Sequence, residues 1–352
     1  PEVSIKLYSG IYYLESRGYR PEEIFRIGKT LKNKAKRYYT VDNSIYENRK
    51  SAGNVIDKEA GILNRGNLTR LKNFLNRAAK GERLTVGFIG GSITQGFAAT
   101  DPDKCYAART VAWLRKVFPN TEFDYVNAGI GATNSQFGAA RVQEDLLCRL
   151  PDLVMVEFSV NDHCTPHDME TYEGLIRQIY GSRSCPAMVL LHSVYYDTGK
   201  SAAYYHAQIG RHYDLPCISM QNSIYPAVAA GKLPAEKITA DFLHPNDLGH
   251  EFMVAVITNF LEKVIHDKTE EQQEIFPAPL TENAYEHCAR LQYFNSTPEK
   301  SGFEEDMTPQ RGITDIFRNG WSAGEKGAYL EFAFRGTGAA VQYRRVKDGP
   351  AP

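Results

Sequence analysis

Val86–Gly96 reads VGFIGGSITQG, an apolar run that ends in two glycines and a serine. The run Val86–Ile89 is typical of a buried strand, and Ser92 stands where a helix would begin. Gly90 and Gly91 permit a tight turn with few side chains around it, which would leave the Ser92 hydroxyl accessible at the end of the strand. This stretch therefore predicts a strand-turn-helix unit with a polar group at the strand's carboxyl end.

The same alternation of short apolar runs and amphipathic stretches continues from about Leu84 to Ile265. It predicts a mostly parallel sheet with right-handed crossovers and helices on both faces. The strands that we expect are Leu84–Gly90, Phe123–Asn127, Leu153–Phe158, Ala187–Val194 and Cys217–Ser219. The helices that we expect are Tyr106–Val117, Ser135–Cys148, Met169–Tyr180, Ser201–Tyr213 and Leu248–Val264. Polar residues that follow such strands would meet beyond their carboxyl ends, where open parallel sheets bind ligands.

The segments on either side of this region have different patterns. Before it, Pro21–Tyr38 and Arg65–Lys80 are helical candidates, and after it Lys268–Pro279 is a charged linker. Tyr329–Arg335 and Ala340–Arg344 then alternate apolar and polar residues around Gly-Thr-Gly, which predicts a hairpin. We expect an N-terminal extension over residues 1–80, an α/β domain over 81–267 and a β-rich accessory region over 280–352. This last region either pairs with N-terminal segments or is incomplete, because so short a β module leaves open edges.

Composition argues against several classes of function. A net charge of −1 over 352 residues gives no electrostatic basis for binding nucleic acid. No apolar run approaches the ~20 residues of a membrane helix. The first residues lack the basic start and apolar stretch of a secretory signal, so we expect a cytoplasmic protein. The six cysteines have no repeated short spacing, which favours reduced thiols.

Three further polar blocks follow predicted strands. Asn127–Ser135, NAGIGATNS, offers a glycine whose backbone N–H lies near a helix start. Phe158–His163, FSVNDH, brings the carboxamide of Asn161 to the same edge. In Asp241–Pro245, DFLHP, a carboxylate three residues before a histidine can orient one ring nitrogen while the other faces a nucleophile. Together with Ser92, these groups would complete a site that cleaves esters.

The four blocks resemble the motifs of the SGNH (GDSL-type) hydrolase superfamily, over roughly Leu84 to Ile265. The resemblance implies a three-layer α/β/α, flavodoxin-like domain that hydrolyses esters through an acyl-enzyme and needs no cofactor. It also implies a site composed of the nucleophile Ser92, the base His244, its orienting carboxylate Asp241, and an oxyanion hole made by Ser92, Gly131 and Asn161.

Two departures from the family pattern bear on this interpretation. The opening motif is Gly-Gly-Ser-Ile-Thr in place of Gly-Asp-Ser, as in a subgroup that includes bacterial carbohydrate esterases. The glycine block offers both Gly129 and Gly131. We favour Gly131 because it stands directly before the Ala-Thr pair, and Gly129 is the second choice.

The subgroup resemblance, the β-rich region and the pairs Tyr195-Tyr196 and Tyr204-Tyr205 favour a carbohydrate O-acetylesterase. Acetylated xylan or mannan oligosaccharides would be its substrates. The alternatives are a lipid or acyl-ester hydrolase of the lysophospholipase or thioesterase type, and a sugar-binding protein without catalysis. We expect a small-molecule or oligosaccharide acetyl ester as the partner, with no nucleic acid and no membrane. The sequence makes no prediction of oligomeric state.

Several of these residues also have a purely structural interpretation. Gly-Gly-Ser after a strand can be a turn or a phosphate cradle, and Asn161 can cap the next helix. His163, Cys164 and His167 have ligand-like side chains, but no fourth ligand stands near them, so we predict no metal. His192 either faces the crevice or is packed in the core. Similarly, Trp321 either stacks on a sugar ring or anchors a small core.

Overall fold

The computed structural model describes residues 2–8 and 55–344 of the chain, which form two compact units. The larger unit contains the described residues 55–291 and 308–318, and the smaller contains 2–8, 292–307 and 319–344. The expected helix over Pro21–Tyr38 lies outside the described residues.

The larger unit is built on a six-stranded sheet with the strand order β2-β7-β6-β5-β3-β4. Five strands run parallel, and only β2 is antiparallel, at the edge beside β7. The strands are β2 (Ile62–Asn64), β3 (Leu84–Gly90), β4 (Phe123–Gly129), β5 (Leu153–Glu157), β6 (Ala187–His192) and β7 (Cys217–Ser219). Because the central strands are parallel, the ends of β3, β4 and β5 open toward the same edge of the sheet.

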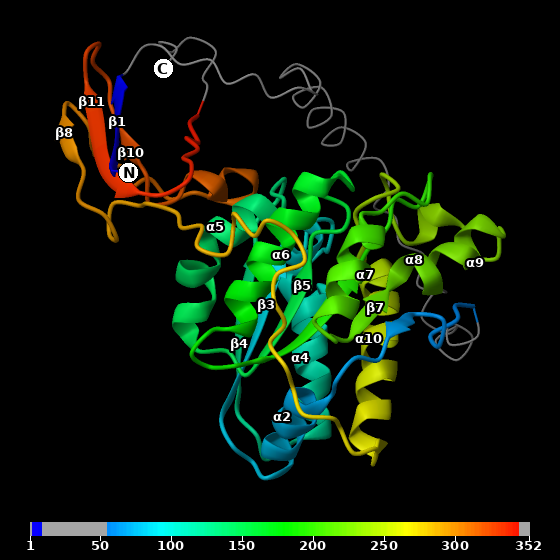
Figure 1. Ribbon diagram of the computed structural model, residues 1–352. Helices are drawn as coiled ribbons and strands as arrows, with labels where there is room; N and C mark the ends of the chain where they lie inside the picture. The colour runs from blue at the N-terminus through cyan, green and yellow to red at the C-terminus, as the bar shows by residue number, and fades with distance from the viewer. Residues whose placement is uncertain (1, 9–54, 345–352) are drawn as a thin grey trace. The chain divides into compact units, whose positions relative to one another are not determined.

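Helices cover both faces of this sheet (Figure 1). One layer contains α2 (Thr69–Ala79), α4 (Tyr106–Val117) and α10 (Asp247–His266), and the other contains α5 (Ser135–Asp145), α6 (Pro166–Tyr180) and α7 (Ala203–His212). The shorter helices are α3 (Ser92–Gln95), α8 (Met220–Ser223), α9 (Tyr225–Ala229), η3 (Pro102–Lys104), η4 (Leu147–Arg149), η5 (Ala235–Lys237) and η6 (Gly312–Phe317). The expected three-layer α/β/α fold is confirmed.

Consecutive residues of β3 show why its sequence is apolar throughout. The Phe88 ring packs edge-on against Tyr106 of α4, with ring centres 5.9 Å apart. Its neighbour Ile89 joins a buried cluster on the other face, with Leu175 and Ile176 of α6. Side chains alternate between the faces of a strand, so a strand covered on both faces needs apolar residues at every position.

Most sequence boundaries agree with the structure, and the differences have local causes. The bounds of β3, β7 and α4 match the expected ranges. The helix expected over Ser135–Cys148 ends at Asp145, and the separate turn η4 follows it. The sequence analysis missed β2, because three half-buried residues are too few to show a period.

The smaller unit contains a three-stranded antiparallel sheet with the order β1-β11-β8. Its strands are β1 (Glu2–Tyr8), β8 (Glu299–Ser301) and β11 (Tyr329–Arg335), and a second pair joins β9 (Glu304–Glu305) to β10 (Trp321–Ser322). The predicted hairpin is wrong, because residues 336–344 form no strand. β11 instead pairs with β1 on one side and β8 on the other, so distant segments protect both of its edges.

The chain after α10 returns along α2 of the larger unit. Arg65 forms ion pairs with Asp267 (2.8 Å) and Glu271 (2.5 Å), and Lys72 contacts the same two carboxylates. The segment expected to be a linker is therefore fastened at its start. Within residues 2–8 and 55–344, no helix combines the length and the apolar character needed to span a membrane.

Candidate active site

The turn after β3 brings Ser92 to the start of α3. Gly91 is the N-cap of this helix, and a Cβ at Gly91 would lie only 2.1 Å from Asn161 Oδ1. A Cβ at Gly90 would lie 2.2 Å from Thr94 Oγ1. Both glycines are therefore required by close packing, which explains the Gly-Gly pair before the serine.

Ser92, His244 and Asp241 form a continuous hydrogen-bonded chain. Ser92 Oγ lies 2.8 Å from His244 Nε2, and His244 Nδ1 lies 2.6 Å from Asp241 Oδ2. Because an ionised carboxylate only accepts, the Nδ1–H donates to Asp241, and Nε2 is left to accept the Ser92 proton. Ser92 and His244 are 152 positions apart in the sequence and come together only at the edge of the sheet.

Hydrogen bonds from backbone N–H groups hold the Asp241 carboxylate in place. Its Oδ1 accepts from the N–H groups of Leu243 (3.0 Å) and His244 (2.8 Å). Burial alone would raise the pKa of Asp241, but the hydrogen bonds from the His244 ring and from these amides outweigh it and lower the pKa to about 2. Asp241 is therefore a fixed negative charge behind the imidazole.

The structure distinguishes the two candidate glycines of the second block. The Gly129 N–H donates to Asn127 Oδ1 (2.9 Å), and a Cβ at Gly129 would lie 2.3 Å from the Gln95 backbone nitrogen. Gly131 lies nearer the nucleophile, because its Cβ would fall 3.6 Å from Ser92 Cβ. Its N–H donates to Gln95 Oε1 at 3.1 Å. Gly131 is therefore in contact with the Ser92 residue, and its role as an oxyanion donor stays a prediction.

The Asn161 carboxamide lies against Gly91, beside the nucleophile. It does not cap the following helix, because α6 is capped by Thr165 with a reciprocal bond to Asp168. Among the described residues, the buried Asn161 Oδ1 has no hydrogen-bond partner. The structure thus brings Ser92, Gly131, Asn161, Asp241 and His244 to one edge of the sheet, while their catalytic roles stay a prediction.

Several residues that support the site were missed by the sequence analysis. The buried Asp162 accepts from the Ser135 N–H (2.9 Å) and pairs with His206 Nε2 (2.8 Å), which links the Asn161 loop to the start of α5. The buried Arg141 donates to the carbonyls of Ala128 (2.6 Å) and Gly90 (3.1 Å), at the ends of β4 and β3. The position of Asp162 directly after Asn161 was the only local signal.

Phe97 also contacts the site. Its ring centre lies 4.5 Å from that of His244, and the residue is 48% exposed. Phe242, directly after Asp241, is 47% exposed and has φ of +61°, which is unusual for a bulky side chain. Two exposed aromatic side chains therefore belong to the two segments that carry the imidazole and the nucleophile turn.

Other residues singled out from the sequence lie elsewhere. His192 is fully buried and so is packed in the core, and Trp321 of the smaller unit packs against Phe332, with ring centres 5.4 Å apart. His167 contacts Gln136 (3.2 Å). No group of three or more metal-ligating side chains occurs in the part of the chain that the structure describes, and the absence of a metal stays a prediction.

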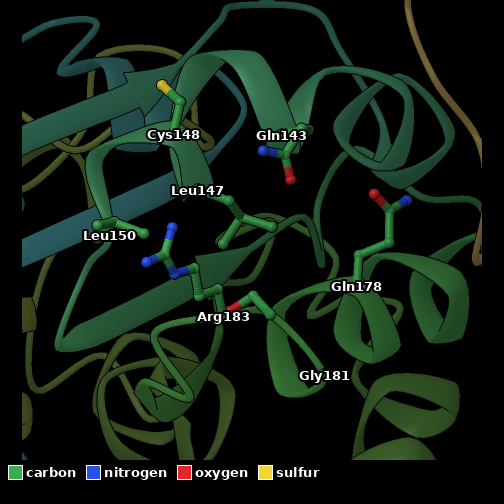
Figure 2. Close-up of a pocket in the computed structure, with 8 residues that line it drawn as sticks. Gln143, Leu147, Cys148, Leu150, Gln178, Gly181 and Arg183 are labelled. Atoms are coloured by element: carbon green, nitrogen blue, oxygen red, sulfur yellow. The ribbon is translucent and has the colours of Figure 1, made fainter.

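A surface hollow of about 390 Å³ lies between the end of α5, η4 and the end of α6. Figure 2 shows the side chains that line it. Its lining includes Gln143, Cys148, Leu150 and Arg183, and none of the five predicted site residues. This hollow is therefore separate from the candidate active site.

Comparisons with known proteins agree with this geometry. The GDSL-like lipase/acylhydrolase family matches residues 88–252. A crystal structure of a two-domain esterase active on acetylated mannans, crystallised with mannopentaose, is 50% identical with a TM-score of 0.72, over 77% of this chain and 73% of that one. A second crystal structure of a two-domain esterase active on acetylated mannans, described without mannopentaose, matches at 50% identity and a TM-score of 0.73, over 77% of this chain and 74% of that one. The comparison with curated proteins found no match. The chain belongs to the GDSL-like lipase/acylhydrolase (SGNH hydrolase) family and is a carboxylic ester hydrolase.

Proposed function

We propose that the chain is a serine esterase that removes O-acetyl groups from carbohydrates, with acetylated mannan oligosaccharides as its substrates. The hydrogen-bonded chain from Ser92 through His244 to Asp241 is the observation that carries this proposal. The 50% identity to an esterase active on acetylated mannans supports the substrate class. The exposed Phe97, whose ring contacts the imidazole, and the exposed Phe242, two residues before His244 in the chain, offer apolar surface that a pyranose ring can cover.

In the proposed reaction, Ser92 Oγ attacks the acetyl carbonyl while His244 Nε2 takes its proton. Asp241 keeps the imidazole in the required tautomer and stabilises its cationic form. The Ser92 and Gly131 N–H groups and the Asn161 carboxamide stabilise the tetrahedral oxyanion. The imidazolium of His244 then gives this proton to the departing sugar oxygen, which leaves as a hydroxyl, and water, activated by the same imidazole, releases acetate from Ser92.

We further propose that the site lies wholly within the larger unit and that the β-rich unit is an accessory region. Ser92, Gly131, Asn161, Asp241 and His244 all belong to the larger unit. The two units share no residue of the proposed mechanism. On this proposal, changes confined to the smaller unit leave the hydrolysis of a small ester intact.

The test measures acetate release from acetylated mannan oligosaccharides by mass spectrometry, with ethyl acetate as a small ester. Ser92→Ala should lose activity on both substrates by a factor of about 10⁴ or more, because the acyl-enzyme cannot form. Ser184→Ala is the matched control, since Ser184 lies in the turn between α6 and β6. Unchanged acetate release by Ser92→Ala would remove Ser92 from the mechanism. Hydrolysis of esters with long acyl chains, without acetate release from acetylated sugars, would refute the proposed substrate class.

A further inference from the structure

The Gly131 N–H already has an acceptor in this structure, the side-chain oxygen of Gln95 (N···Oε1 3.1 Å). Gln95 is the last residue of α3, three positions after the nucleophile. The other end of the same carboxamide donates to Asp315 Oδ2 (3.0 Å) and to the Gly312 carbonyl (3.3 Å). Gln95 therefore bridges the proposed oxyanion donor and η6.

The three partners allow only one orientation of the Gln95 carboxamide. The Gly131 N–H needs an acceptor, whereas the Asp315 carboxylate and the Gly312 carbonyl need a donor. A flipped amide would place Nε2 against an N–H group and Oε1 against two oxygens. The contacts with η6 thus direct Oε1 toward Gly131, and Asp315 acts on the donor through Gln95.

Within the larger unit, η6 is itself held in place by Arg290. Arg290 Nη2 donates to the carbonyls of Ile316 (2.7 Å) and Arg318 (3.0 Å), at the end of η6. The Arg290 guanidinium also lies 5.1 Å from the centre of the Phe137 ring on α5. Asp315 is 19% exposed and therefore sits in a partly buried, fixed position.

We propose that Gln95 is a gate residue, which occupies the Gly131 donor in the resting enzyme and must release it when the substrate oxygen arrives. This inference rests on the function proposed above. An N–H group donates well to one acceptor at a time, so the oxyanion and Gln95 Oε1 compete for Gly131. The hydrogen bonds to Asp315 and Gly312 set how readily Gln95 withdraws, which makes Gln95 and Asp315 positioning residues that act through Gly131.

The gate predicts that shortening Gln95 speeds the reaction. Gln95→Ala and Gln95→Asn cannot span from Asp315 to Gly131, so kcat for ethyl acetate should rise about two- to tenfold, the equivalent of one net hydrogen bond. KM should change little, because the donor matters most when the oxygen carries charge. Gln143→Ala, at an exposed position on α5 (Figure 2), is the matched control and should leave kcat unchanged.

A double-mutant cycle tests whether Asp315 acts on the Gly131 N–H through Gln95. Asp315→Ala should also raise kcat, while Asp315→Asn, which still accepts from Gln95 Nε2, should resemble the parent enzyme. In the Gln95→Ala background, Asp315→Ala should have no further effect, since nothing remains for it to hold. If Gln95→Ala does not fold, judged by its thermal unfolding, Gln95→Asn and Asp315→Ala decide the question.

A lower or unchanged kcat in both Gln95 variants, or an effect of Asp315→Ala that persists without Gln95, would overturn the gate. A purely structural role for Gln95 predicts such losses, so the sign of the change separates the two. The proposed function fails in a different way, by the absence of ester hydrolysis in the parent enzyme or by an active Ser92→Ala. A slow Gln95 variant of an active parent refutes only the gate.

Discussion

The two units of the described chain use their strands in contrasting ways. Every residue of β6 in the larger unit is buried, because helices cover both faces of the sheet. In β11 of the smaller unit, only Leu330 is buried among seven residues, and all of β8 is exposed. The central strands of the larger unit thus consist of continuous apolar runs, while the sheet of the smaller unit depends on pairing between segments far apart in the chain. The residues of the proposed active site all belong to the unit that has the closed core.

The largest expected effect separates chemistry from folding. Asp241→Asn should lower kcat by about 10⁴-fold, because the amide no longer fixes the His244 tautomer. The smaller unit should keep its unfolding midpoint, and the larger unit should lose no more than the stabilisation that the ionised carboxylate supplies, since the amide is isosteric with it. The measurement is ethyl acetate hydrolysis together with urea unfolding. Asp214→Asn is the matched control, at an exposed turn before β7 where φ is +50° and asparagine is tolerated.

The pH dependence of the parent enzyme sharpens the same point. The pKa of Asp241 is lowered to about 2, below the ordinary value of about 3.9. Its contribution to stability is therefore complete above about pH 4 and is lost only as the pH falls through about 2. Urea unfolding of the parent and of Asp241→Asn should therefore differ by a constant amount in free energy between pH 5 and pH 8, and the difference should shrink only at lower pH. A difference that already shrinks between pH 7 and pH 5 would contradict the lowered pKa of Asp241.

The next expected effect compares the two cores directly. Leu190→Ala in β6, at a fully buried position, should cost about 3–5 kcal/mol of unfolding free energy. Leu330→Ala in β11 should cost about 2 kcal/mol, the low end for such a change, because its exposed surroundings can close around the gap.

The two tryptophans allow each unit to be followed separately. Trp113 lies in α4 of the larger unit, and Trp321 lies in β10 of the smaller. Urea unfolding monitored by fluorescence in Trp113→Phe and Trp321→Phe backgrounds reports one unit each. Equal losses from the two leucine variants would contradict the contrast between a covered and an open sheet.

The smallest expected effect concerns the buried His192 at the end of β6. Burial, followed by the nearby charges of His206 and Arg211, lowers its pKa to about 3, and neither ring nitrogen has a partner among the described residues. The unfolded chain therefore binds a proton below about pH 6.5 that the folded chain does not. Stability should fall by about 2 kcal/mol between pH 7 and pH 5 from this group alone.

His192→Leu should remove that acid-dependent loss, measured as urea unfolding at pH 7 and pH 5. His266→Leu, at an exposed position at the end of α10, should leave the loss in place. If His192→Leu remains as sensitive to acid as the parent, another buried group is responsible. No comparable effect is expected in the smaller unit, where the described residues include no buried histidine.

The sequence by itself determined the parallel strands and the long helices of the larger unit, but not the edge strand β2, because apolar periods of sufficient length are local properties of the chain. Its motifs, through their resemblance to those of the SGNH hydrolases, also led us to predict Ser92, Gly131, Asn161, Asp241 and His244 as site residues, and the structure brings these residues to one edge of the sheet. Only the tertiary structure decided that β11 pairs with β1 and β8. β1 lies at the other end of the chain, and exposed strands carry little pattern from which a partner could be predicted. The tertiary structure alone brought Gln95 and Asp315 to the Gly131 amide and Asp162 to His206. A polar side chain's role depends on its neighbours in space, which no local period specifies.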